Sequence, residues 1–156
     1  MTTVWGAPRA AYLLALAIAR EDDQGRSELW ETVSRAGGET DLVIALGAQA
    51  RLMSRAAATA TGKPFDVPDA VWKRIPCPDV RDYSMAAYAG GELGTPSFSC
   101  ARCLRIAAET LAGLHLAAMD AAGIPRTWLA EVCARIPEAD EPVTPSVPDA
   151  GAAVGP

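Results

Sequence analysis

Apolar residues recur along the chain at the three- and four-residue spacing of α-helices. In the segment 41–61 they fall on one helical face, while Arg51 and Arg55 face away from it. No segment shows the sustained alternation of β-branched or aromatic residues that indicates a strand. The pattern therefore predicts an all-α fold.

Capping residues and helix breakers divide this pattern into an irregular or orthogonal bundle of about six helices, built from helical hairpins. Pro8 suits the first turn of a helix, Ser27 and Thr95 are predicted N-caps, and glycines follow several helix ends. The helix that begins at Thr95 is expected to be the longest and to lie near the centre. The predicted helices cover residues 8–20, 27–36, 41–61, 66–75, 95–122 and 125–136, with a further short one over 80–89.

The end of the chain has a different composition. After Pro137 it holds four more prolines, several acidic residues and no large apolar side chain, so it cannot build a core. We expect a single helical domain over residues 1–136 and a disordered, Pro-rich acidic tail over residues 137–156. A domain of that size can bury one hydrophobic core without disulfides or metal.

Two segments of the predicted domain resemble each other. Residues 43–76 align without a gap on residues 104–137, and the alignment pairs Gly62 with Gly123. In each segment a long Ala-rich helix ends at this glycine, turns through a proline and enters a short helix closed by Arg-Ile-Pro. An internal duplication and two independently similar hairpins both explain the match, and both predict the same local architecture.

Charge argues against nucleic acid as the partner. The net charge is −5, and the twelve arginines and two lysines are scattered along the whole chain. Neutralising phosphates requires a concentrated basic surface. The Ala-rich helices suit contacts between helices, so we expect a protein partner or a homo-oligomer.

The apolar run over residues 10–19 is the one segment that raises the question of membrane targeting. Ala17-Ile18-Ala19 has the form of a signal-peptide cleavage site, but a single positive charge, Arg9, precedes the run. Ten residues are about half the length that spans a bilayer. A buried helix in a cytoplasmic protein, with no membrane contact, is the favoured interpretation.

Four cysteines are the first candidates for chemistry. Cys100 and Cys103 have the two-residue spacing that allows a pair of thiolates to bind one zinc ion. If Cys77 and Cys133 converge on this pair, the four residues form a tetrahedral zinc site. A strong zinc signature repeats the close pair, however, and this chain has only one, so buried free thiols are the alternative.

The same close pair could instead be a redox dithiol. A helix N-terminus would lower the pKa of Cys100, and the positive charge of Arg102 would assist. The strand and the βαβ pattern that usually accompany such a motif are missing from the sequence around it.

His115 is the only histidine and falls in the middle of an apolar helical face. It is either a core histidine with a hydrogen-bond partner, for which Gln49 is a candidate, or a general base in an interhelical pocket. Cys103 lies twelve residues away on the same predicted helix, or about 18 Å, so the two cannot share a metal ion.

These observations favour a small helical interaction or regulatory protein without catalytic activity. The alternatives are a zinc-stabilised helical module with a cysteine-only site and an enzyme that uses the buried His115. No dinucleotide-binding, Walker-type or Gly-x-Ser-x-Gly pattern is present in the sequence to favour an enzyme.

Overall fold

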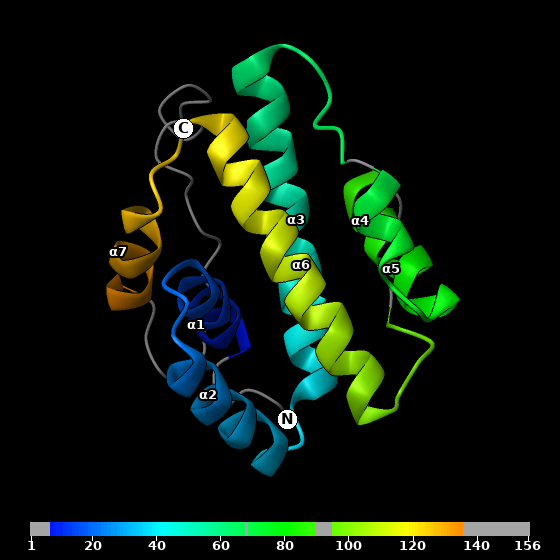
Figure 1. Ribbon diagram of the computed structural model, residues 1–156. Helices are drawn as coiled ribbons and strands as arrows, with labels where there is room; N and C mark the ends of the chain where they lie inside the picture. Colours follow the sequence, from blue (N-terminus) through cyan, green and yellow to red (C-terminus); the bar gives the residue numbers. More distant parts are fainter. Residues whose placement is uncertain (1–6, 68, 90–94, 136–156) are drawn as a thin grey trace.

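The computed structural model of the protein describes residues 7–67, 69–89 and 95–135. These residues form helices and no strand, which confirms the all-α prediction (Figure 1). None of their helices is both long enough and apolar enough to cross a membrane. The predicted tail over residues 137–156 lies outside the described residues. The helices are α1 (Ala7–Ala19), α2 (Asp23–Arg35), α3 (Glu39–Thr61), α4 (Asp69–Lys73), α5 (Pro78–Ala89), α6 (Ala101–Ala122) and α7 (Thr127–Arg135).

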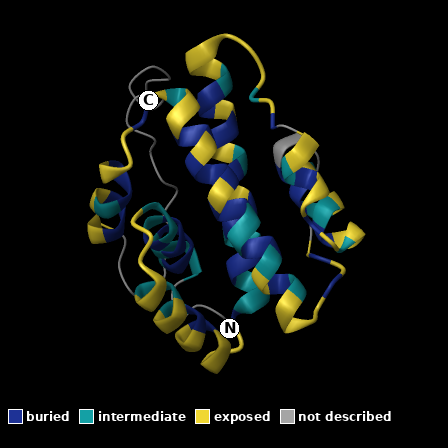
Figure 2. Ribbon diagram, viewed as in Figure 1, coloured by how far each residue is buried: buried dark blue, intermediate teal, exposed yellow. Residues whose placement is uncertain are grey.

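The centre of the fold is the pair formed by α3 and α6. The two helices pack against each other and run in the same direction, with α1, α2 and α7 on one side and α4 and α5 on the other (Figure 1). Buried positions follow the length of both helices (Figure 2). The large side chains with almost no exposed surface include Leu42, Leu46 and Met53 of α3 and Leu111 and Met119 of α6.

Alanine is the residue that makes this close central packing possible. A methyl side chain allows two helix axes to approach, while each buried alanine contributes little apolar area. This explains why half of the chain is apolar although only 6% of it is aromatic. The alanines of the two helices with no more than 1% exposed surface are Ala50, Ala57, Ala107, Ala108, Ala112 and Ala118.

The two similar segments fold in the same local way. Gly62 ends α3 with φ +77°, and Gly123 ends α6 with φ +76°, so both adopt the left-handed conformation that favours glycine. A short helix follows each turn, and Val67 and Trp128, which the alignment pairs, are both buried. The shared architecture is the one that both interpretations of the alignment predict.

The start of α2 differs from the prediction. Its N-cap is Asp22, whose Oδ1 accepts a hydrogen bond from the Gly25 N–H at 2.9 Å, and Ser27 lies inside the helix. Gly25 permits this cap because a Cβ there would lie 2.3 Å from Asp22 Oδ2. Just before this cap the chain turns at Glu21, whose backbone φ is +54°.

The start of α6 also lies later than predicted. The helix begins at Ala101, with Cys100 as its N-cap, and not at Thr95. Phe98 is buried and packs edge-to-face against Tyr83 of α5, with ring centroids 5.7 Å apart. This contact holds the segment before α6 against the fold, so the helix is shorter than its apolar pattern suggests.

Candidate functional site

Cys100 occupies the N-cap position of α6. Its backbone is extended, with φ −70° and ψ +142°, and its Sγ accepts a hydrogen bond from the backbone N–H of Cys103 at 3.2 Å. A cap residue and the residue three positions later share the first helical turn, so their side chains are neighbours. The Cys100 side chain is exposed, which leaves its sulfur open to a reagent or a partner.

Cys103 is half-buried and has two thiols beside it. One belongs to Cys100, and the other belongs to Cys77. Cys77 itself directly precedes α5, and its carbonyl accepts a hydrogen bond from the Arg81 N–H at 3.0 Å, as an N-cap carbonyl does. Cys77 and Cys100 thus each stand at the start of a helix, and both act on the pKa of Cys103.

The surroundings shift the pKa values of Cys100 and Cys103 in opposite directions. Hydrogen bonds from the side chain and the backbone of Cys103 lower the pKa of Cys100, and Arg102 acts in the same direction. Hydrogen bonding to Cys100 raises the pKa of Cys103 to about 11, with partial burial and the Cys77 thiol as further causes. Since the thiolate is the nucleophile, these opposite pKa shifts favour Cys100 over Cys103 as the nucleophile of the pair.

Cys133 lies elsewhere in the fold. It is buried in α7, which packs against α1, and burial raises the pKa of its thiol against the opposing charges of Arg9 and Arg20. Among the described residues, no group of three or more His, Cys, Asp or Glu side chains is placed to hold a metal ion. The zinc site formed by Cys77, Cys100, Cys103 and Cys133 therefore stays a prediction.

His115 is completely buried in α6. Its ring meets the ring of Tyr12 edge-on, with centroids 5.9 Å apart, and burial lowers its pKa to about 4. Within the described part of the chain neither ring nitrogen has a hydrogen-bond partner, and Gln49 donates instead to the Pro8 carbonyl at 3.1 Å. The expected pairing with Gln49 is not formed. A catalytic role for His115 stays a prediction. The ring that would carry this role has no exposed surface.

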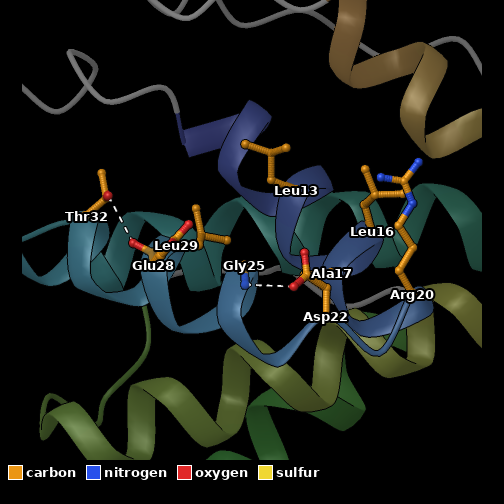
Figure 3. A pocket seen from close by; sticks show the side chains of 9 residues that line it. All are labelled: Leu13, Leu16, Ala17, Arg20, Asp22, Gly25, Glu28, Leu29 and Thr32. Carbon is orange, nitrogen blue, oxygen red and sulfur yellow. Dashed lines mark hydrogen bonds between the residues drawn. The ribbon is translucent and has the colours of Figure 1, made fainter.

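A groove of about 330 Å³ lies between α1 and α2 (Figure 3). Half-buried Leu13 and Leu16 of α1 and Leu29 of α2 line it, and Arg20 and Glu28 lie at its opposite ends. The sequence analysis did not identify this groove. One sequence feature could have indicated it: α1 is apolar almost all round. A helix with so many apolar residues cannot bury them all and leaves some at the surface.

Comparison with known proteins adds no functional information, because the chain matches no protein-family model, no curated protein and no solved structure.

Proposed function

We propose that this chain is a small helical regulatory protein that exchanges disulfides with a protein partner through Cys100. The observation that carries the proposal is the position of its exposed Sγ at the N-cap of α6, hydrogen-bonded to the Cys103 N–H at 3.2 Å and beside the Cys103 thiol. A helix N-terminus stabilises a thiolate because its free N–H groups carry partial positive charge.

The exchange proceeds in two steps that conserve atoms and electrons. The Cys100 thiolate attacks one sulfur of the partner's disulfide, and the partner's other sulfur leaves as a thiolate. The Cys103 thiol then gives up its proton to that thiolate or to water and attacks Cys100 Sγ, which releases the partner's first sulfur. The chain loses two hydrogens and the partner's disulfide becomes two thiols.

Cys100 orders these steps through the pKa of Cys103. It raises that pKa as long as its sulfur is a thiol or thiolate that can accept a proton from Cys103. Once Cys100 is part of a mixed disulfide, that acceptor is lost and Cys103 ionises more readily. The resolving sulfur therefore becomes active after the first step and not before it.

The proposed partner is a protein, and the proposed location is the cytoplasm. The net charge of −5 disfavours nucleic acid. Disulfides in the cytoplasm are usually transient and regulatory, which fits a chain whose four cysteines are all free thiols.

Reaction with oxidised glutathione, a small disulfide, tests the proposal by intact mass. Wild type should lose two hydrogens, Cys103→Ser should hold one glutathione on Cys100, and Cys100→Ser should react at least ten times more slowly. Cys133→Ser is the matched control and should behave as wild type, because that thiol is buried against α1. Equal rates for Cys100→Ser and wild type would overturn the proposal.

The groove between α1 and α2 supports a second candidate function, which is self-association. Three half-buried leucines line it, and opposite charges stand at its two ends. A twofold axis across such a groove would place Arg20 of one copy opposite Glu28 of the other, so the surface is complementary to itself. We propose a second copy of the chain as its occupant.

Light scattering over a dilution series tests this second candidate. Wild type should show the mass of a dimer, Arg20→Glu and Glu28→Arg should each weaken it at least tenfold, and the double variant should restore it. A monomer at all concentrations, or single variants that associate as wild type does, would rule out this interface.

A further inference from the structure

The helices α3 and α6 occupy equivalent places in the fold. They are the long helices of the two similar segments, 43–76 and 104–137, and they lie side by side in the same direction (Figure 1). Both α1 and α5 pack against this central pair, α1 from one side and α5 from the other. An approximate half-turn about an axis along the pair therefore interchanges α3 with α6 and α1 with α5.

The helix α2 breaks this equivalence. It lies in the link between α1 and α3, and its Trp30 reaches across to α6, where the indole N–H donates a hydrogen bond to Glu109 and Arg105 lies against the ring. The corresponding link between α5 and α6 contains no helix in its described part, residues 95–100. The surface of α6 on which Trp30 rests should therefore have a counterpart on α3 that no such helix covers.

That counterpart is apolar and open to solvent. The alignment pairs Arg105 with Ile44, which is half-buried. It pairs Glu109 with Ala48, which is exposed, and Leu52 follows four residues later on the same side of α3. Leu52 is 36% exposed and is one of two large apolar side chains that are exposed in the described part of the chain. We call Ile44, Ala48 and Leu52 the α3 ridge.

Two arginines extend the α3 ridge. Arg51 and Arg55 follow Ile44 and Ala48 by seven residues each, a spacing that places them on the same side of the helix. Among the described residues neither arginine forms an ion pair, and the Arg51 Nε has no hydrogen-bond partner. The ridge thus carries local positive charge on a chain whose net charge is −5.

We propose that the α3 ridge binds an amphipathic, acidic helix of a partner protein, in the place that corresponds to α2. The ridge offers apolar contact to an aromatic or aliphatic side chain, and Arg51 and Arg55 attract acidic side chains. The helix α2 itself has this character, since residues 21–37 hold five acidic residues and two arginines besides Trp30. The α3 ridge does not include Cys100, so this docking goes beyond the disulfide exchange and does not depend on it.

An NMR titration of the ¹⁵N-labelled full-length chain with a synthetic peptide of residues 21–37 tests the proposal. An isolated helix of this length is marginally stable in water, so binding should be weak, which chemical shifts still detect. The amides of residues 44–55 should shift. Leu52→Glu and Arg55→Gln should each weaken binding at least fivefold. Ala134→Glu, the matched control, changes the charge by the same amount at an exposed position of α7 and should bind as wild type does.

Each result decides the proposal. Absent shifts, or shifts confined to α1 and α6, where the peptide would replace α2, would overturn it. Equal binding by Leu52→Glu and wild type would also overturn it. If Leu52→Glu abolishes self-association in light scattering, the α3 ridge is a contact between copies of the chain and the partner assignment is wrong. The mapping on wild type needs no substitution, so the answer does not depend on whether a variant folds.

Discussion

The indole Nε1 of Trp30 donates a hydrogen bond of 2.9 Å to Oε2 of Glu109, across 79 residues of sequence. The contact joins α2 to the central helix α6. Arg105 lies 5.2 Å from the centre of the Trp30 ring and 3.5 Å from Glu109 Oε2, so it supports both partners. Trp30 is one of only two buried residues of α2, so this contact ties a core residue of that helix to α6.

Glu109→Ala should therefore loosen α2. The indole N–H would lose its acceptor while its ring stays buried, and we expect a loss of about 1–2 kcal/mol in the free energy of unfolding. Glu109→Gln retains an acceptor and should lose less. Urea denaturation measures both, with the exposed Glu131→Ala of α7 as a control within about 0.5 kcal/mol of wild type. A Glu109→Ala protein as stable as this control would contradict the proposed anchoring.

His115 makes the stability of the fold depend on pH. Its pKa is about 4 in the folded protein and 6.5 without burial, so the unfolded chain binds a proton more readily between these values. Stability is complete above about pH 6.5 and falls as the pH decreases toward 4. The histidine alone contributes a loss on the order of 3 kcal/mol over this interval. Denaturation at a series of pH values measures the slope.

His115→Leu should remove that slope and raise the stability at pH 7 by about 1 kcal/mol, since it replaces a buried ring whose nitrogens have no partner among the described residues. The difference between variant and wild type isolates His115 from the carboxylates that titrate in the same interval. A clearly less stable variant with an unchanged slope would show that the ring is hydrogen-bonded in solution.

The glycines that end α3 and α6 should respond equally to substitution. Gly62→Ala and Gly123→Ala each place a Cβ on a left-handed residue and should destabilise the fold by about 1 kcal/mol. Gly113→Ala is the matched control within α6, where nothing lies within 4 Å of the added Cβ. It should stabilise the fold by about 0.5–1 kcal/mol. Thermal melts distinguish the opposite signs, and a loss of stability in all three variants would refute this account.

Zinc analysis addresses the four-cysteine site. We expect purified protein to hold no stoichiometric zinc and its melting temperature to stay constant when a chelator is added. The reason is that Cys133 lies on α7 against α1, whereas Cys103 lies beside Cys77 and Cys100. One zinc ion per chain, lost in Cys133→Ser, would establish the predicted site instead.

The helices were largely predictable, and the two errors in their starts have local causes. Hydrophobic spacing located α1, α3 and the body of α6, because burial against the centre imposes that spacing. Ser27 and Thr95 are good cap residues, but neighbouring residues fix the two helix starts elsewhere. The buried Phe98 holds the segment before α6, and Gly25 leaves room for the Asp22 cap.

The candidate site was predictable only in part. The spacing of Cys100 and Cys103 indicated a possible dithiol, and its place at a helix N-terminus followed once the helix start was known. The effect of Cys77 on Cys103 depends on how α5 packs against α6. No local sequence pattern indicates this packing. The contact between Glu109 and Trp30 was not predictable either, because helical periodicity cannot show that Trp30 reaches Glu109 from α2.

The hydrogen bond from the Cys103 N–H to Cys100 Sγ has a spectroscopic consequence. An amide proton is sensitive to the charge and position of its acceptor. Under the proposed exchange, the Cys103 amide would face a thiolate, a mixed disulfide and an internal disulfide in turn. Each state should therefore give the Cys103 amide its own chemical shift in a ¹H–¹⁵N spectrum. A single resonance at the start of α6 would report the redox history of the whole protein without any label on sulfur.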